Sequence, residues 1–503
     1  MRSLPLLTLA LIGCGVADGD VSSLDKRLTA LEQENAALKE QVDALQKELG
    51  GDEEPPPALD NQIDDLDGRI DDLDGRIANL ETEAVRQIRA DLTLNVPADH
   101  TTLQDALVWL DGYSIASDVW VTIQLAPGTY AFDEAILFQH GNGNRVRVLG
   151  DIGDPSTTVL HFTGDANSTG WGRALRARSS VLGWFDGITV RGNDAAGTIG
   201  IEASDGGVFL TGPNVVVEGF GRTGFRAARN GTISAEGTTA QNNPGHGYLA
   251  QQGGFIAAWS STSTGNGGHG YVAQETSSIG ASPSTASNNL GAGYIAQRNS
   301  SISAWHAAAT GNSYAGFEAL EGSAIAAGEA SATDNGEHGF SAYGSSAVDA
   351  YKTVSNNNGK AGWGSGYSSS ASSHVGADEG SASGNHDSGF TAENASAMFA
   401  KTATSTSNGA WGFGAGPTST MQANNSTATS NAEGFVAYGN GFIGADDSTA
   451  TNNTTFSYNV FWGGWMLATN STSSGAQYDY NLGPWNWTNQ IPSEDGWGVI
   501  WAE

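Results

Sequence analysis

A glycine followed by an aromatic residue recurs through the second half of the chain at a nearly constant interval. The first seven of these pairs are 23 residues apart, and three more follow at intervals of 27, 23 and 22 residues. The pairs are Gly224-Phe225, Gly247-Tyr248, Gly270-Tyr271, Gly293-Tyr294, Gly316-Phe317, Gly339-Phe340, Gly362-Trp363, Gly389-Phe390, Gly412-Phe413 and Gly434-Phe435. A repeat this short cannot bury a core alone, so it predicts a solenoid of stacked repeats.

Other positions of the repeat are also constant. When the glycine is position 1, position 4 is usually alanine, position 10 isoleucine or valine, position 12 alanine and position 20 asparagine. The asparagines of five successive repeats are Asn266, Asn289, Asn312, Asn335 and Asn358. Because the constant positions are all even, they predict short strands with one face turned inward. We therefore predict a parallel β-helix over residues 166–453, with rungs about 4.8 Å apart.

The constant residues suggest how the coil is held together. We expect the aromatic and β-branched side chains to stack inside, and each asparagine amide to bond the identical amide one rung away. Asparagine and glycine are also expected to supply left-handed backbone corners, which other residues adopt at a cost.

The charge balance limits the partners of the chain. The 503 residues include 69 glycines, only 15% are charged, and the net charge is −32. After residue 230 the basic side chains are Arg298, Lys352, Lys360 and Lys401. Since phosphate backbones are bound by Lys and Arg, this composition argues against a nucleic-acid partner.

The sequence Gly-His-Gly occurs at 245–247 and again at 268–270. It resembles one signature of the polygalacturonases, but their Asn-Thr-Asp and Arg-Ile-Lys motifs occur nowhere in this chain. The residue at the histidine position also varies between repeats, so we interpret His246 and His269 as solvent-facing residues that recur with the repeat and have no catalytic role. As a metal site they would lack a third ligand. We predict no catalytic residue, no metal site and no cofactor.

Residues 91–165 differ in character from the repeats. The segment 100–110 predicts an amphipathic helix capped by Thr101 or Thr102, and 119–130 predicts a strand that ends at a Pro-Gly turn. This pairing resembles the start of the pectin-lyase-like right-handed β-helices, in which a helix caps the open end of the coil. The resemblance implies a right-handed coil and says little about activity.

The N-terminus resembles a bacterial lipoprotein signal. A charged start and a short apolar stretch precede Leu11-Ile12-Gly13-Cys14, which resembles a lipobox. We predict a signal peptide at 1–13, lipidation of Cys14 and a tether at 14–20. The non-acidic Gly15 implies the bacterial outer membrane or cell surface; an ordinary signal peptide is the alternative.

Two heptad seams follow the tether, at 21–49 and 59–90, separated by an acidic, proline-rich linker at 50–58. The segments RLTALE (27–32) and RIANLE (76–81) resemble the signature of parallel trimeric coiled coils. Asn35 in the first seam favours a dimer instead. We predict a homotrimeric stalk.

Two regions interrupt or end the repeat. The interval of 27 residues places a four-residue insertion within 363–381, which we predict to be a binding loop. Residues 454–503 are expected to form an aromatic cap or a sugar-binding tip. The candidate binding tryptophans are Trp462, Trp465, Trp485, Trp487, Trp497 and Trp501.

Together these features resemble phage tailspikes and bacterial surface fibres. The first functional hypothesis is a lipid-anchored trimeric fibre that binds glycans or surfaces without catalysis. The alternative is a polysaccharide lyase or glycoside hydrolase with carboxylates in an inter-subunit groove. The acids that we considered form no evident pair: Glu318, Glu321, Asp349, Asp378 and Glu379. A purely structural scaffold is the third possibility.

Overall fold

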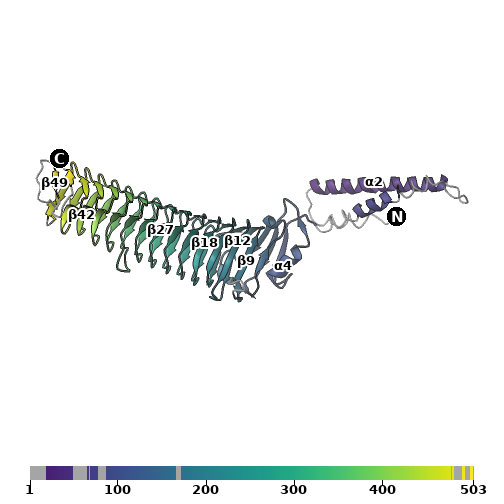
Figure 1. Ribbon diagram of the computed structural model, residues 1–503. Coiled ribbons are helices and arrows are strands. Elements are labelled where there is room, and N and C mark those ends of the chain that lie inside the picture. Colours follow the sequence, from purple (N-terminus) through teal and green to yellow (C-terminus); the bar gives the residue numbers. More distant parts are fainter. Residues whose placement is uncertain are drawn as a thin grey trace. The chain divides into compact units, whose positions relative to one another are not determined.

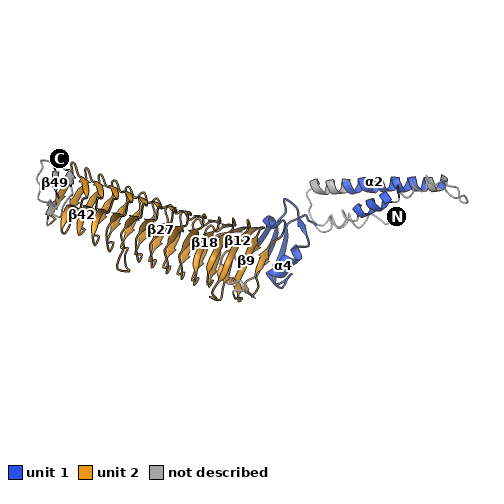
Figure 2. Ribbon diagram, viewed as in Figure 1, with its two compact units in different colours: residues 1–123, 140–147 blue, residues 124–139, 148–503 orange. Residues whose placement is uncertain are grey.

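The computed structural model describes residues 18–48, 65–66, 68–77, 87–165, 172–476, 478–480, 490–492 and 499–501. The chain divides into unit 1 (1–123 and 140–147) and unit 2 (124–139 and 148–503), blue and orange in Figure 2. The predicted signal peptide, Cys14, the linker at 50–58, Trp485, Trp487 and Trp497 lie outside the described residues, as does the side chain of Trp501.

Unit 1 holds the helical part of the chain. Its elements are α2 (Asp18–Glu48), β1 (Gln87–Ile88), β2 (Leu92–Val96), α4 (Leu103–Leu110), β3 (Ser114–Ile115) and the short helix η1 (Gly143–Arg145). Strands β4 (Val121–Leu125) and β7 (Val146–Leu149) cross the division between the units. The predicted capped helix forms as α4, in which the Thr102 side chain accepts a hydrogen bond from the Asp105 backbone N–H.

Residues of both predicted seams pack against each other within one chain. Leu38 and Val42 of α2 form a buried cluster with Leu66, Ile70 and Leu73 of the helical segments at 65–77. Asn35 Nδ2 donates to Asp74 Oδ1 at 2.6 Å. The homotrimer stays a prediction. Among the described residues, no helix has the length and apolar character needed to cross a membrane.

Unit 2 is a parallel β-helix, which confirms the predicted fold class (Figure 1). Each rung contributes one strand to each of three parallel sheets, in the order first, second and third sheet. A short helix, η2 (Pro155–Thr157), precedes β8.

The first sheet follows the Gly-aromatic pairs. Its strands are β6 (Ile136–Phe138), β9 (Gly172–Arg178), β12 (Thr198–Ser204), β15 (Thr223–Ala228), β18 (His246–Gln251), β21 (Tyr271–Gln274), β24 (Tyr294–Gln297), β27 (Phe317–Leu320), β30 (Phe340–Tyr343), β33 (Tyr367–Ser370), β36 (Phe390–Ala392), β39 (Trp411–Ala415), β42 (Glu433–Tyr438), β45 (Phe456–Phe461) and β48 (Tyr478–Tyr480).

The second sheet carries position 10 of the repeat. Its strands in unit 2 are β10 (Val181–Asp186), β13 (Val208–Thr211), β16 (Thr232–Ser234), β19 (Phe255–Ala257), β22 (Ser278–Gly280), β25 (Ser301–Ser303), β28 (Ala324–Ala326), β31 (Ala347–Asp349), β34 (His374–Gly376), β37 (Ala397–Phe399), β40 (Thr420–Gln422), β43 (Phe442–Gly444), β46 (Trp465–Leu467), β49 (Gln490–Pro492) and β50 (Val499–Trp501). Only the pairing of β49 with β50 is antiparallel among the described pairs.

The third sheet completes each rung. Its strands are β5 (Gly128–Phe132), β8 (Thr158–Phe162), β11 (Ile188–Arg191), β14 (Val215–Glu218), β17 (Thr239–Gln241), β20 (Thr262–Thr264), β23 (Thr285–Ser287), β26 (Ala308–Thr310), β29 (Ser331–Thr333), β32 (Val354–Asn356), β35 (Ser381–Ser383), β38 (Thr404–Thr406), β41 (Thr427–Thr429), β44 (Thr449–Thr451) and β47 (Thr472–Ser474). Strands of the three sheets therefore occur on both sides of the predicted limits 166 and 453.

The aromatic residues of the repeat form one buried column inside the coil. From Phe225 to Phe340 their rings stack at centroid distances of 4.7–4.8 Å, within 7° of parallel. Each tyrosine hydroxyl of this column reaches a polar partner across the coil; Tyr271 Oη, for example, lies 2.9 Å from Ser261 Oγ. Burial of the rings thus leaves no phenol unpaired in these rungs.

The asparagine ladder also forms as predicted. Asn312 Nδ2 donates to Asn335 Oδ1 at 3.0 Å, and Asn335 Nδ2 donates to Asn358 Oδ1 at 3.0 Å. The predicted left-handed backbone, however, belongs to the preceding residue, such as Asn288 with φ 54°. The ladder asparagines have ordinary φ values because they must point inward, and the exposed residue before them makes the corner.

The role predicted for the glycine of the pair was also wrong. Gly270 has no positive φ, but a Cβ there would lie 2.6 Å from the Gly293 carbonyl oxygen and 3.1 Å from the Ala286 Cβ. Glycine is therefore required at this corner by close packing between rungs.

The insertion lies earlier than predicted. Phe340 pairs in register with Tyr367, and Tyr367 with Phe390, so Gly366-Tyr367 is the true repeat pair and the extra residues fall between Asn358 and Gly366. Trp363 is consequently absent from the inner column, and the residue is 48% exposed. The spacing misled because Gly362-Trp363 mimics the repeat at the interval of 23 residues.

Candidate active site in a groove on the first sheet

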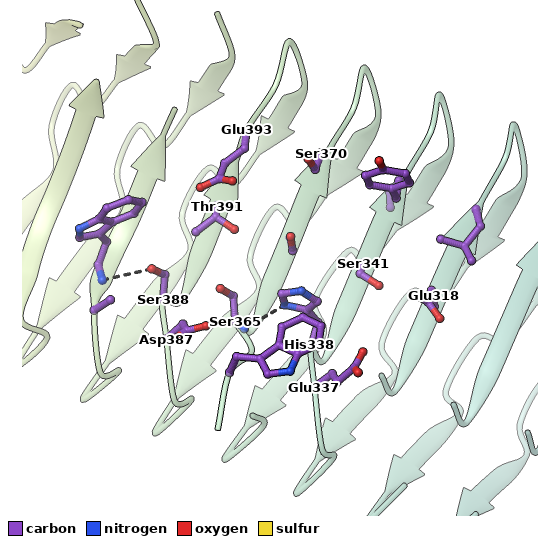
Figure 3. A pocket seen from close by; sticks show the side chains of 17 residues that line it. Glu318, Glu337, His338, Ser341, Ser365, Ser370, Asp387, Ser388, Thr391 and Glu393 are labelled. Carbon is purple, nitrogen blue, oxygen red and sulfur yellow. Dashed lines mark hydrogen bonds between the residues drawn. The ribbon is translucent and has the colours of Figure 1, made fainter. Parts of the chain in front are cut away.

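A groove with a volume of about 600 Å³ runs over the outer face of the first sheet, from β27 to β39. Its floor is position 3 of the repeat, where Glu318, Ser341, Ser368 and Thr391 lie side by side on successive rungs. The edges of the groove are formed by side chains that precede and follow position 3 in the sequence. In Figure 3, Glu337, His338 and Asp387 follow one edge, and Ser370 and Glu393 the other.

The floor changes character at Glu318. On the three preceding rungs the same outward position is Leu249, Val272 and Ile295, each at most 4% exposed. A carboxyl group thus follows an apolar column on a strand whose neighbours shield it from water. Burial, and secondarily the negative charge of Glu337, raise the pKa of Glu318 to about 7.

Glu337 lies one rung further along, at the end of the corner before β30. Burial raises the pKa of this carboxyl group as well. Because the charge of Glu337 acts on Glu318, the two groups form an interacting pair of carboxyls at one end of the groove. Burial therefore favours the protonated form of both carboxyls, and the charge of Glu337 adds to this effect at Glu318.

His338 stands beside this pair. Its Nδ1 accepts a hydrogen bond of 2.9 Å from the Ser365 backbone N–H, and burial lowers its pKa to about 4. The ring is therefore neutral at pH 7, with the proton on Nε2. The indole of Trp363 meets it edge-on, with ring centroids 5.3 Å apart.

The inserted loop is tied to the rung above it. The Gly364 backbone N–H donates to Asp387 Oδ2 at 2.8 Å, which fixes the end of the loop. Trp363 and Trp411 both line the groove, and Glu393 accepts a hydrogen bond of 3.0 Å from the Tyr438 hydroxyl. The insertion thus contributes an exposed aromatic side chain to the groove.

The histidines of the two Gly-His-Gly segments lie further back on the same sheet. The rings of His246 and His269 stack at 5.3 Å, and His246 Nδ1 accepts a hydrogen bond from the His269 backbone N–H at 3.0 Å. Burial is the main cause that lowers the pKa of His246, to about 4. The prediction that this position faces solvent was wrong, because both residues are only partly exposed and burial lowers the pKa of both imidazoles.

The candidate tryptophans whose side chains the structure describes, Trp462 and Trp465, do not line this groove. Trp462 and Trp465 are exposed, at 62% and 51%, near β46. Of the acids named from the sequence, only Glu318 belongs to the groove; Glu321, for example, lies near Arg298 at 3.6 Å. Within the described ranges, no three His, Cys, Asp or Glu residues are grouped closely enough to hold a metal ion.

The outward position of the repeat carries a signal for this site. Position 3 of the repeat changes from Leu, Val and Ile to Glu, which marks a carboxyl in an apolar column. Its partner Glu337 belongs to the next repeat, two residues before the glycine, and only the register of the rungs brings the two together.

Comparisons with known proteins give a limited result. No family model matches the chain, and the search of curated proteins returned no significant match. Among solved structures, the chain is similar to the A-module of the Azotobacter vinelandii mannuronan C-5 epimerase AlgE4, with 13% identity, a TM-score of 0.32, and coverage of 82% of this chain and 100% of that one.

Two further solved structures show a comparable likeness. The Agl-KA catalytic domain has 12% identity, a TM-score of 0.37, and coverage of 77% of this chain and 68% of that one. The GH87 α-1,3-glucanase catalytic unit of Streptomyces thermodiastaticus has 10% identity, a TM-score of 0.31, and coverage of 83% and 71%. At these values the likeness carries no weight for activity or substrate.

Proposed function

We propose that this protein hydrolyses glycosidic bonds in an uncharged polysaccharide bound along the groove. The observation that carries the proposal is the interacting pair Glu318 and Glu337 at the groove's end. Glycoside hydrolysis requires two carboxyl groups in different protonation states. This pair favours the enzymatic alternative over the non-catalytic fibre that was the first hypothesis.

The two carboxyls differ in what their surroundings allow. Glu318 lies at the end of the floor next to the apolar column that ends at Ile295, and its pKa of about 7 keeps it partly protonated at neutral pH. It is suited to donate a proton to the glycosidic oxygen as the bond to the leaving sugar breaks. Glu337 then serves as the ionised carboxylate that stabilises the sugar cation or activates water.

The charges in the groove distinguish hydrolase from lyase. Four of the seventeen lining residues are acids, Glu318, Glu337, Asp387 and Glu393, and among these described lining residues none is Lys or Arg. A uronate polymer would meet several carboxylates without a compensating cation. Uncharged sugars avoid this repulsion and would hydrogen-bond the Ser and Thr side chains of the floor.

The proposal is tested by incubating the purified chain with uncharged polysaccharides and with polyuronates. We expect new reducing ends from at least one uncharged glycan and no unsaturated product from any uronate. Ultraviolet absorbance from an unsaturated product would show that the protein is a lyase and not a hydrolase. Absence of cleavage across the uncharged panel, in a chain shown to be folded, would refute the proposal.

Substitution of Trp363 by alanine is expected to raise KM about five- to tenfold with little change in kcat, because the exposed indole stacks on a sugar away from the cleaved bond. Initial rates on the cleaved substrate measure both constants. Trp184→Ala, which removes a similarly exposed indole from β10, is the matched control. If KM and kcat of Trp363→Ala equal those of the wild type, the inserted loop does not take part in substrate binding.

The sequence also supports a proposal on location. We propose that the chain is exported, lipidated at Cys14 and held at the bacterial cell surface as a homotrimer. Cys14→Ser is expected to move the protein from the membrane fraction to the soluble fraction, as seen by fractionation and immunoblotting. An unchanged distribution would contradict lipid anchoring.

A further inference from the structure

Two exposed tryptophans stand in register on the corner between the second and third sheets. Trp259 follows β19 and Trp305 follows β25, and they are 45% and 37% exposed. Ala257, Gly280 and Ser303 are aligned on successive rungs, so the tryptophans, each two residues further on, are two rungs apart. This spacing is about 10 Å along the coil.

Each indole packs over a glycine on the next rung, where a larger residue would clash with the ring. A Cβ at Gly280 would lie 3.0 Å from Trp259 Nε1, and a Cβ at Gly328 would lie 2.5 Å from Trp305 Cζ3. The Trp305 backbone N–H also donates to Ser282 Oγ at 2.8 Å. Each indole thus covers a glycine with part of its surface and presents much of the remainder to solvent.

This corner lies across the coil from the groove sheet. The ring of Tyr271 starts on β21 of the first sheet, and its hydroxyl reaches Ser261 at 2.9 Å, two residues after Trp259. The corner residues Trp259 and Trp305 are therefore separate from the proposed catalytic site. They also belong to rungs before those that line the groove.

The surroundings specify an uncharged polar ligand. The exposed acids Glu236 and Glu329 lie at the same corner, one rung before Trp259 and one rung after Trp305, and would repel an anionic polymer. The neighbouring strands β20, β23 and β26 carry hydroxyl side chains and no charged residue. A surface of aromatic faces beside hydroxyls fits sugar rings better than an apolar protein segment.

We propose that Trp259 and Trp305 form a second, non-catalytic site that binds an extended uncharged polysaccharide lying along the coil. The two-rung spacing is about the length of two pyranose units, so every second sugar would stack on an indole. The occupant is a glycan rather than a second copy of this chain, since the acids at the corner of one copy would face those of the other.

The test uses the full chain with Glu318→Gln, so that a bound glycan is not cleaved. Binding to insoluble cellulose, chitin and α-glucan is measured by co-sedimentation, with Trp259→Ala/Trp305→Ala compared against Trp184→Ala, which removes an exposed indole elsewhere on the coil. We expect the double variant to lower the affinity for at least one of these glycans at least tenfold, and Trp184→Ala to leave it unchanged.

A second variant keeps the indole but displaces it. Gly328→Ala places a methyl group against Trp305, so it should weaken binding several-fold while circular dichroism remains that of the folded chain. Unchanged affinity in Trp259→Ala/Trp305→Ala, absence of wild-type binding to all three glycans, or a loss of self-association instead of glycan binding would overturn the site.

The hydrolytic groove and the tryptophan site can be tested independently. With Glu318 retained, the Trp259→Ala/Trp305→Ala variant is expected to cleave a short soluble oligosaccharide at the wild-type rate. A loss of that activity in the tryptophan variant would contradict the separation of the two sites.

Discussion

Substitution of Glu318 by glutamine is expected to lower the rate of glycan cleavage about thousandfold while the substrate still binds. A general acid contributes about 10²–10⁴ in rate, and an amide has no proton to donate to the leaving sugar. The side chain keeps its size on the floor of the groove, so its neighbours Ile295 and Ser341 need not move. Reducing-end formation measures the rate, and equilibrium binding of an oligosaccharide shows whether the groove is intact.

The assignment of Glu318 as the acid also predicts how the cleavage rate depends on pH. Because the pKa of Glu318 is raised to about 7, the acid form is lost as pH rises through 7, and the wild-type rate should fall there. Glu337→Gln removes the negative charge that helps to raise this pKa, so any residual activity of that variant should decline at a lower pH. A decline at an unchanged pH would mean that Glu337 does not act on Glu318.

Stability supplies the control for folding. A carboxyl whose pKa is raised from its ordinary 4.5 to about 7 stabilises the fold fully below pH 4.5, and this contribution is lost as pH rises through 7. Glu318→Gln should therefore be at least as stable as wild type at pH 8. Glu321→Gln, on the same rung but exposed near Arg298, should retain full activity. Full activity in Glu318→Gln would refute the assigned acid.

The architecture was predictable because a solenoid repeats its interior contacts in the order of the sequence. Each aromatic residue touches its equivalents one repeat away, so the 23-residue interval directly reports the stacking of Tyr271 on Tyr248 and Tyr294. Position 20 reports the asparagine ladder in the same way. The interval fails only where loop length changes, as at Trp363, where an accidental Gly-Trp pair occupied the expected place.

The candidate site was less predictable because its residues are the exceptions to the repeat. Glu318 and Glu337 are 19 residues apart and occupy different positions of their units, so no periodic pattern pairs them. Whether the two carboxyls interact depends on the packing of side chains at the edge of the groove. The register of the rungs must be known before a residue that departs from the repeat, such as Glu318, can be matched with its neighbours.

The asparagine ladder supplies the second large effect. Substitution of Asn312 by leucine is expected to destabilise the coil by about 4 kcal/mol, although leucine has nearly the same size. Asn312 Nδ2 donates to Asn335 Oδ1 and to the Ala286 carbonyl, both at 3.0 Å, and its Oδ1 accepts from the Asn289 side chain and backbone at 2.9 and 3.1 Å. Four buried hydrogen bonds are lost at once.

The cost arises from the groups that stay behind. Leucine leaves the Asn289 backbone N–H without its acceptor in a corner that excludes water, whereas Asn335 Oδ1 still accepts from the backbone of residue 312. Thr310→Ala, two residues earlier but exposed, should change stability by less than about 0.5 kcal/mol. Denaturant unfolding measures both values, and hydrogen exchange at Asn289 shows whether the loss is local, as expected where rungs contact only their neighbours. If Asn312→Leu matched Thr310→Ala, the amide ladder would follow from the coil's geometry without holding the rungs together.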